Sequence, residues 1–316
     1  MSLYLHPVVY LFLEAASPGS ESIYHLFDYF LIVAVFVATA ITFLVFYLGF
    51  RYRQKKNDSE PEQSHGNSKI EITLTLITAC VVAFFFYLTV STMLSIQKPA
   101  GDHQPDVVIT GHQWWWEVEY PKDGVIAANE VHLPVGKKLL IDLKTADVIH
   151  DWWVPALGRK MDMIPGKTNH IWLTIDKPGT YIGACSEYCG AQHAWMRIHV
   201  VAQSPADFKK WEKAHAEPAR QPQSELAQKG HNLFMSSTCV NCHAIEGTKA
   251  GGRIGPDLTH IGSRKTLLSG MMKNDPANLD KWLTNPQKVK KGAHMPNFLF
   301  TRLQVKELTA YLEGLK

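Results

Sequence analysis

The stretch Cys185-Ser-Glu-Tyr-Cys189-Gly-Ala-Gln-His193-Ala-Trp-Met196 decides how this sequence of 316 residues is interpreted. It brings two thiols, an imidazole and a thioether into one short loop. Sulfur and imidazole are ligands that suit copper, whereas hard cations take oxygen. A mononuclear blue-copper site needs one cysteine, and a second cysteine four residues away allows two thiolates to bridge two copper ions. The loop therefore predicts a binuclear copper site.

A further histidine ligand must come from another part of the chain. His150, in the stretch Asp147-Val-Ile-His150, lies where an earlier strand is expected to end. Two alternatives remain open, a disulfide between the two cysteines of the loop and a zinc site. A disulfide would leave the histidine and the methionine of the loop unexplained, and zinc rarely takes methionine. Binuclear copper is therefore favoured.

A second cofactor site is indicated by Cys239-Val-Asn-Cys242-His243, the C-x-x-C-H signature for attachment of c-type haem. The spacing lets both sulfurs form thioethers while the adjacent imidazole reaches the iron. Met295 is the expected second axial ligand, because Met/His ligation suits an electron-transfer haem of high potential. The alternative, with His294 as the ligand and Met295 in the core, remains open.

Two long apolar runs, residues 29–50 and 72–96, contain no charged side chain. Each exceeds the roughly 20 residues that cross a bilayer, so the pair predicts a transmembrane hairpin rather than buried core helices. The loop between them is basic at its start, at Arg51, Arg53 and Lys55, which places it in the cytoplasm by the positive-inside rule. The chain after the second run is then expected outside the cytoplasmic membrane.

Residues 1–22 allow two interpretations. The apolar stretch 3–13, followed by Ala15-Ala16-Ser17, is consistent with a cleaved signal peptide, but it lacks a positively charged start. The alternative is an outward-facing segment at the membrane surface, so cleavage is left open.

The cysteine count and the charge bound the remaining possibilities. The two sites use four of the five cysteines, and Cys80 remains as a small apolar residue of the second membrane helix. No pair is left for a structural disulfide. The formal net charge of +3 gives no sign of nucleic acid or of another strongly acidic partner.

The pattern changes after about residue 99 to short β-branched runs, with Pro-Gly turns at Pro165 and Pro178. Short strands at such spacing predict a β-sandwich or barrel. Together with the metal-ligand loop, they predict an all-β cupredoxin sandwich in which this loop joins the last two strands. The expected strands are Val107–Thr110, Lys138–Leu143, Asn169–Ile175 and Arg197–Val201.

The C-terminal part of the chain is interpreted as a small all-α domain. Ser224 begins its first helix, and a capping box that starts at Thr301 opens its last helix. Gly230, which has no side chain, lets the two helices cross closely, with Phe234 and Tyr311 packed at the crossing.

The copper loop, Cys-x-Glu-x-Cys-x-x-x-His-x-x-Met with the upstream Asp-x-x-His, resembles the CuA loop of subunit II of the haem–copper cytochrome c oxidases. The resemblance implies that the cysteines bridge two coppers, that each histidine binds one copper, and that methionine is a weak ligand. It implies two roles for Glu187, a backbone carbonyl ligand to copper and a carboxylate that reaches magnesium at the partner subunit. The implied metal ligands are His150, Cys185, Glu187, Cys189, His193 and Met196.

Two further features take their implied roles from the same family. In Gly111-His-Gln-Trp114-Trp115-Trp116, the tryptophans are candidates for the surface at which electrons reach the copper, and Trp114 matches the family's position for this role. The family more often has tyrosine in place of Trp115, and a buried aromatic cluster is the alternative. Glu71 matches a carboxylate that feeds protons to the partner, although the Trp and Pro that usually follow are missing. A simple helix-start acid is the alternative for Glu71.

The C-terminal part resembles class I cytochromes c. Gly255-Pro256-Asp257-Leu258 matches the segment whose proline carbonyl accepts the ring N–H of the axial histidine, and the Met295 loop matches the one that supplies the axial methionine. With this fused domain, the chain resembles subunit II of the caa-type cytochrome c oxidases. The expected division of the chain is a two-helix membrane anchor with the N-terminal segment (1–98), a cupredoxin CuA domain (99–203), a linker (204–223) and a cytochrome c domain (224–316).

The resemblance implies that the chain accepts electrons from an external donor at a c-type haem and passes them through binuclear CuA to the haem–copper subunit, which reduces oxygen to water. The implied partners are subunit I, subunit III, membrane lipid and, as donor, a soluble cytochrome c or a high-potential iron–sulfur protein. Lys288, Lys290 and Lys291 either orient an acidic donor or form a solvated basic face. The implied location is the bacterial cytoplasmic membrane, with the C-terminal domains on its outer side.

Two alternative functions remain open, a free-standing membrane-anchored electron carrier and the corresponding subunit of a CuA-containing nitric oxide reductase. A quinol oxidase subunit II would lack the copper ligands that are present here. Nitrous oxide reductase needs a large second copper domain, for which 316 residues leave no room. Because the chain has no apparent oxygen site, oxygen chemistry is expected in the partner subunit.

Overall fold

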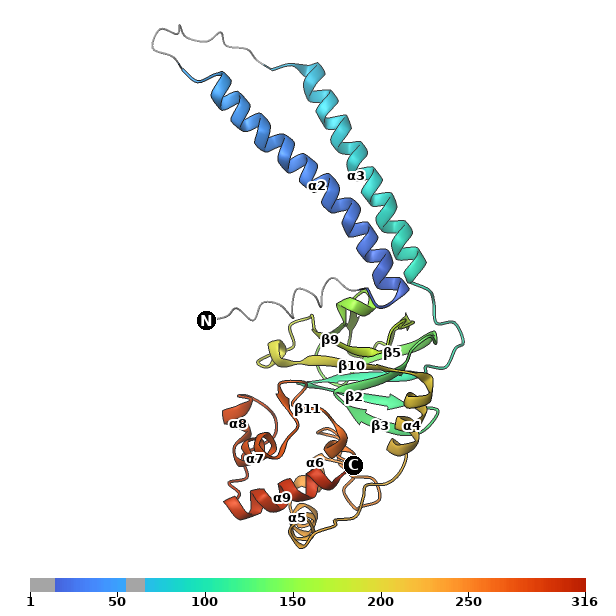
Figure 1. The fold of residues 1–316 in the computed structure, drawn as a ribbon, viewed down its shortest axis with the longest axis vertical. Helices are drawn as coiled ribbons and strands as arrows, with labels where there is room; N and C mark the ends of the chain where they lie inside the picture. The colour runs from blue at the N-terminus through green and yellow to red at the C-terminus, as the bar shows by residue number, and fades with distance from the viewer. Residues whose placement is uncertain (1–14, 55–65) are drawn as a thin grey trace. The chain divides into compact units, whose positions relative to one another are not determined.

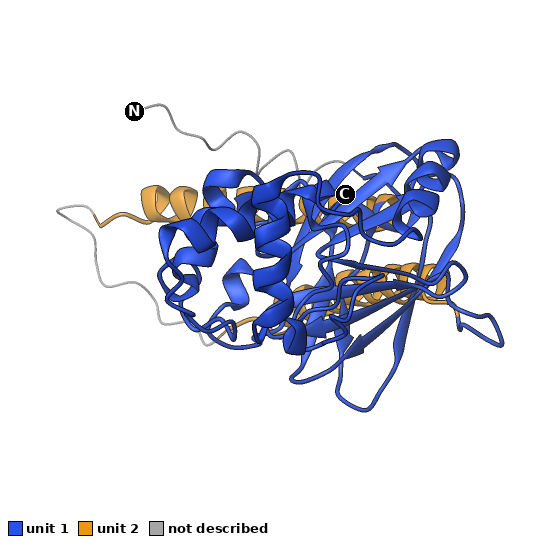
Figure 2. Ribbon diagram, turned by 90° about the horizontal axis from the view of Figure 1, so that it is seen from below, with its two compact units in different colours: residues 1–20, 99–316 blue, residues 21–98 orange. Residues whose placement is uncertain are grey.

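The computed structural model describes residues 15–54 and 66–316. The chain divides into two compact units, residues 21–98 and residues 99–316 together with residues 1–20 (Figure 2). Most of residues 1–22, for which cleavage as a signal peptide was left open, and most of the expected cytoplasmic loop lie outside the described residues.

The unit of residues 21–98 consists of two long helices, α2 (Pro18–Arg51) and α3 (Ser68–Ile96). Both are long and apolar enough to cross a membrane. Large apolar side chains point outward along them, and Phe36, for example, is 72% exposed. Phe30 of α2 meets Phe85 of α3 edge to face, with ring centroids 5.9 Å apart. Exposed apolar faces on paired helices fit a lipid environment and would be unfavourable in water.

The start of α3 shows what Glu71 contacts. The Asn67 side chain caps the helix by accepting a hydrogen bond from the Lys69 backbone N–H at 3.1 Å. The Glu71 carboxylate in turn accepts a hydrogen bond from the backbone N–H of Asn67 at 3.3 Å. Glu71 therefore contributes to the N-terminal cap of α3, the ordinary role of an acid at a helix start.

The larger unit begins with two five-stranded sheets packed face to face (Figure 1). Their orders are β3-β2-β1-β5-β8 and β4-β10-β9-β6-β7, with β1 parallel to β5 and β4 parallel to β10. Fully buried side chains such as Ile109, Leu143 and Ile198 fill the space between the sheets. The strands are β1 (Val107–His112), β2 (Trp115–Tyr120), β3 (Val125–Ala128), β4 (Glu130–Pro134), β5 (Leu139–Thr145), β6 (His150–Trp153), β7 (Met161–Met163), β8 (Asn169–Leu173), β9 (Gly179–Cys185) and β10 (Arg197–Gln203).

The sandwich confirms the predicted fold class and corrects one detail. β9 and β10 are antiparallel neighbours, and the loop with the copper-ligand sequence joins them, as expected. His150, however, is the first residue of β6, whereas the sequence suggested the end of an earlier strand; β5 already ends at Thr145. The difference arises because Ala146 to Ile149 form an irregular connection that the local pattern did not reveal.

The rest of this unit is mainly helical. Its elements are α4 (Pro205–His215), α5 (Glu225–Ser236), α6 (Cys239–Cys242), the short hairpin β11 (Thr266–Leu267) and β12 (Met272–Lys273), α7 (Pro276–Thr284), α8 (Pro286–Val289) and α9 (Arg302–Gly314). Short 3-10 turns lie at Pro155–Leu157 and His193–Trp195 in the sandwich and at Ile261–Ser263 in the helical part. The predicted caps are confirmed, because Ser224 caps α5 and Thr301 forms a capping box with Gln304 at α9.

Helices α5 and α9 cross at Gly230, as predicted (Figure 1). A Cβ atom on Gly230 would lie 1.9 Å from the Glu307 carbonyl oxygen and 2.9 Å from the Tyr311 Cβ. Phe234 packs beside this crossing, with its ring centroid 5.9 Å from that of Tyr311. The absence of a side chain at Gly230 therefore sets the distance between the two helices.

Replacing Gly230 with alanine is expected to destabilise the helical domain. The added methyl group forces α9 away from α5, and overpacking of this kind costs about 1–3 kcal/mol or more. Chemical unfolding of the full chain, followed by far-UV circular dichroism, measures the loss. Gly314→Ala in α9 is the matched control, since a Cβ there meets nothing within 4 Å. Equal stabilities of the two variants would contradict the explanation.

A stack of rings joins the sandwich, α4 and the helical domain. Trp211 of α4 lies against His132 of β4 at 4.2 Å between centroids and against His215 at 4.4 Å. His215 in turn lies 4.5 Å from His260 of the helical domain. Burial lowers the pKa of His215 to about 4 and also lowers those of His132 and His260. The three imidazoles of this histidine stack are therefore neutral in the folded protein at pH 7.

The histidine stack should make stability depend on pH. The unfolded chain protonates its histidines near pH 6.5, whereas the folded protein resists protonation of His215 until about pH 4. The unfolded state binds more protons in this interval, so stability falls as pH drops from about 6.5 to about 4. His215→Phe keeps a ring but removes this proton site, and the melting temperature of the variant should depend less steeply on pH there. A slope in His215→Phe equal to that of the unmodified protein would refute the linkage.

Candidate metal centre and haem pocket

The two cysteines of the ligand loop lie side by side in the sandwich. Cys185, at the end of β9, and Cys189, in the loop, are both buried, with sulfur atoms 3.8 Å apart. His150 at the start of β6 completes a cluster whose ligand atoms all lie within 4.8 Å of one another. The two thiols are not joined, and their separation far exceeds a disulfide bond length.

The other expected ligands surround this cluster. His193 Nδ1 lies 3.6 Å from the Cys189 sulfur, and Met196 Sδ lies 3.8 Å from the same atom. The Glu187 carbonyl oxygen lies 3.2 Å from the Cys185 sulfur, while the Glu187 side chain is exposed. The structure thus brings together all six residues that the sequence suggested. Two sulfurs, two imidazoles and a thioether form a donor set that fits copper better than a hard cation or zinc.

The surroundings prepare these groups for metal binding. The Cys189 thiol and the His150 ring lower the pKa of Cys185 to about 4, against the effect of burial. The same contact raises the pKa of Cys189, because two adjacent thiols do not ionise independently. Metal binding requires the thiolate, so Cys185 is ready to coordinate, and Cys189 would release its proton to solvent when a metal binds.

Asp147 orients the His150 ring. Its carboxylate accepts a hydrogen bond from His150 Nε2 at 2.8 Å, so that Nδ1 faces the Cys185 sulfur at 3.9 Å. The other carboxylate oxygen of Asp147 accepts a hydrogen bond from the Gln113 backbone N–H at 2.7 Å. Asp147 belongs to the Asp-x-x-His motif, and its position three residues before a ligand histidine was the sequence signal for this orienting role.

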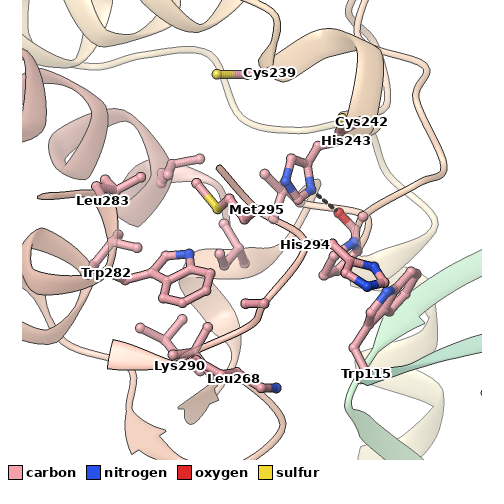
Figure 3. Close-up of a pocket in the computed structure, with 18 of the residues that line it drawn as sticks. Trp115, Cys239, Cys242, His243, Leu268, Trp282, Leu283, Lys290, His294 and Met295 are labelled. Atoms are coloured by element: carbon pink, nitrogen blue, oxygen red, sulfur yellow. Dashed lines mark hydrogen bonds between the residues drawn. The ribbon is translucent and has the colours of Figure 1, made fainter. Parts of the chain in front are cut away.

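The haem signature lies on α6 and the residue that follows it. His243 Nδ1 donates a hydrogen bond to the Pro256 carbonyl at 2.7 Å, as the resemblance implied. Burial lowers the pKa of His243, which keeps the ring neutral and its Nε2 available to a metal. Met295 lines the same cavity as His243 (Figure 3).

The cavity fits a flat, largely apolar group held by Cys239 and Cys242. A Cβ atom on Gly255 would lie 2.5 Å from His243 Cε1, so the glycine leaves room for the imidazole against the backbone. Trp282 also lines the cavity (Figure 3). The other lining residues are mainly apolar and include Phe234, Leu258, Ile261, Leu267, Leu279, Leu283, Phe298, Phe300, Leu308 and Leu312.

The three tryptophans occupy different environments. Trp114 is 8% exposed, and its indole N–H donates a hydrogen bond to the Cys189 carbonyl at 2.9 Å. Its ring lies 5.3 Å from that of His294, the neighbour of Met295. Trp115 lines the haem cavity, whereas Trp116 is fully buried in the sandwich. The first tryptophan thus contacts both the metal-ligand loop and the loop of the expected axial methionine.

Polar contacts fix the helical domain against the sandwich. The Trp114 carbonyl accepts hydrogen bonds from the Ser269 hydroxyl at 3.0 Å and from the Lys290 ammonium at 2.9 Å. The buried carboxylate of Glu130 accepts the backbone N–H groups of Lys265 and Thr266 at 2.8 and 2.9 Å. Because these contacts join residues more than a hundred positions apart, no local pattern could reveal them.

The interpretation of the three lysines before the Met295 loop as an exposed group is wrong for Lys290. Lys288 and Lys291 are exposed, as a solvated basic face requires, but Lys290 is only 5% exposed and bonds to the sandwich. Lys290 is therefore unavailable to an external donor.

Asp147→Asn should weaken copper binding by about 10- to 100-fold, since residues that orient a ligand histidine typically contribute this much. The amide has the same shape but no longer fixes the tautomer of His150. Competition with a copper chelator measures the affinity. Asp102→Asn, at an exposed position away from the site, is the matched control. An affinity equal to that of the control would refute the role of Asp147.

Three parts of the chain match known families. Residues 6–90 match cytochrome C oxidase subunit II, transmembrane domain, and residues 124–203 match cytochrome C oxidase subunit II, periplasmic domain. Residues 227–316 match cytochrome c. These families give the sandwich copper and the helical domain haem c as cofactors. They also describe a membrane-anchored protein with its sandwich on the outer side of the membrane.

Similar proteins agree over most of the length. Cytochrome c oxidase subunit 2 of Alkalihalophilus pseudofirmus is 35% identical over 96% of this chain and 90% of its own length. The protein of the same name from Bacillus sp. strain PS3 is 32% identical over 84% of this chain and 80% of its own length. The crystal structure of the periplasmic domain of subunit II of the Bradyrhizobium japonicum cytochrome oxidase is 32% identical, covering 36% of this chain and 95% of that one, with a TM-score of 0.34. The chain belongs to the cytochrome c oxidase subunit II family, with a C-terminal cytochrome c domain, and is part of a haem–copper oxidase that has subunit I as its partner.

Proposed function

We propose that electrons enter the oxidase through this chain, first at the cytochrome c domain and then at the copper-binding sandwich, before they reach the catalytic subunit that reduces oxygen to water. When bound, a c-type haem and a binuclear CuA centre supply one-electron redox chemistry. The observation that carries the proposal is the position of Trp114. Its indole bonds to the backbone of a copper-ligand residue, while its ring lies beside His294 at the haem cavity.

The proposed copper ligands are His150, Cys185, Glu187, Cys189, His193 and Met196, and the proposed haem residues are Cys239, Cys242, His243 and Met295. Support comes from the distances within each set and from the types of donor atom. The proposal also includes magnesium at the exposed Glu187 carboxylate, at the boundary with subunit I. Proton uptake through Glu71 is the weakest part, because this carboxylate already serves the cap of α3.

The proposed division of the chain is 1–98, 99–203, 204–223 and 224–316. The bounds of the helices and strands support it, since α3 ends at Ile96, β10 ends at Gln203 and α5 begins at Glu225. The proposed location is the bacterial cytoplasmic membrane. The proposed further partners are subunit III, membrane lipid and a donor that is either a soluble cytochrome c or a high-potential iron–sulfur protein.

Spectroscopy of the full chain, supplied with haem and copper in detergent, tests the proposal. A seven-line copper hyperfine pattern in the EPR spectrum, with the optical spectrum of a low-spin c-type haem, is the expected result. A four-line mononuclear signal, or no bound copper, would leave a membrane-anchored cytochrome c and would refute the copper relay. Cys189→Ser, which removes one bridging thiolate, should abolish the seven-line pattern while the haem spectrum persists.

Trp114→Ala should slow electron transfer between the haem domain and the copper without removing copper. The substitution deletes the ring beside His294 and the hydrogen bond to the Cys189 carbonyl. Flash reduction of the haem followed by copper absorbance measures the rate in a single turnover. Trp172→Ala on β8, outside this contact, should behave like the unmodified protein. Identical kinetics in both variants would exclude Trp114 from the path.

A further inference from the structure

Lys290 places a positive charge inside the contact between the haem domain and the sandwich. It follows α8 directly and is only 5% exposed. Its ammonium donates a hydrogen bond to the Trp114 carbonyl at 2.9 Å. Among the described residues, no carboxylate forms an ion pair with Lys290. Its charge is therefore not neutralised by an acid, although burying an unpaired ammonium is costly.

The environment of Lys290 reduces its charge only in part. Burial lowers the pKa of Lys290 to about 8, while the nearby Cys189 acts in the opposite direction. A group with this pKa is still mainly protonated at pH 7. The contact with the sandwich thus contains a cation that water screens poorly, unlike the exposed ammonium groups of Lys288 and Lys291.

The position of this cation relates it to both cofactor sites. Lys290 lines the haem cavity together with Met295 and Leu268, and Figure 3 draws it in the cavity wall. The carbonyl that it contacts belongs to Trp114, whose indole bonds to the Cys189 carbonyl at 2.9 Å. The Lys290 side chain thus lines the haem cavity, and Trp114 connects it to the copper-ligand residue Cys189.

A redox centre gains one negative charge when it accepts an electron. A fixed positive charge nearby stabilises the reduced form, and the effect is large only where water is excluded. Resting on the proposed function, we propose that the Lys290 ammonium stabilises the reduced forms of both the haem and the copper centre. Lys290 is not among the proposed ligands of either centre, and it acts on them through its charge.

Redox titration of the full chain, loaded with haem and copper in detergent, tests this role. Haem absorbance and copper EPR report the two midpoint potentials independently of turnover. In Lys290→Met, both potentials should fall, with a roughly tenfold smaller equilibrium constant for reduction at each centre. Lys290→Gln, which keeps a hydrogen-bond donor but no charge, should give the same shift. Lys290→Arg, which keeps the charge, should stay close to the unmodified protein.

Two controls separate charge from structure. Ser269→Ala removes the other hydrogen bond to the Trp114 carbonyl without changing the charge, and both potentials should remain unchanged. Lys291→Met removes an exposed charge next in sequence, and any shift should be small and suppressed by salt. Unchanged potentials in Lys290→Met and Lys290→Gln, or an equal shift in Ser269→Ala, would overturn the role of Lys290. The proposed function fails separately, if the unmodified chain itself lacks the binuclear copper signal or the c-type haem spectrum.

Discussion

The hydrogen bond from the Trp114 indole to the Cys189 carbonyl is the contact on which the relation between the two cofactor sites depends. One end of this bond is the backbone of a metal-ligand residue, and the other is a ring that lies against His294. The Trp114 carbonyl holds the helical domain through Ser269 and Lys290. Trp114 of the sandwich therefore bonds both to the copper loop and to the haem domain. Any movement of the haem domain would disturb the same residue that supports the copper loop.

Packed backbone elements also hold each proposed cofactor site. On the copper side, strands β6 and β9 supply His150 and Cys185, and the Asp147 carboxylate sets the orientation of the histidine. On the haem side, close backbone approaches at Gly230 and Gly255 leave little freedom to the helices and to the His243 ring. Ligands held on strands and packed helices move little when a metal changes its charge, and little reorganisation favours rapid electron transfer.

The sequence alone allowed prediction of features whose residues lie close together along the chain. The helix caps fall within a few residues and were predicted from residue types alone, and the ligand loop and the haem signature, which fall within a dozen residues each, were proposed in the same way. It was insufficient wherever a contact joins distant segments. Lys290 stands beside two exposed lysines and resembles a solvated residue, yet its partner lies 176 positions away. Leu303 shows a related limit, because this apolar residue of α9 is 62% exposed, whereas Val305 two positions later is buried against the helical core.

Under the proposed electron route, the fused haem domain determines where an external donor binds. Trp114 is only 8% exposed, its ring lies against His294, and its carbonyl is bonded to Ser269 and Lys290, so a separate protein has little access to it. The link between the two domains is itself packed, since Trp211 of α4 stacks on His132 of the sandwich. A covalently joined domain held in this way acts at a fixed, high effective concentration, and no docking step limits its contact with the copper loop. Under the proposed function, recognition of an external donor falls to the outer surface of the haem domain, and the contact around Trp114 serves electron transfer between the two proposed cofactor sites.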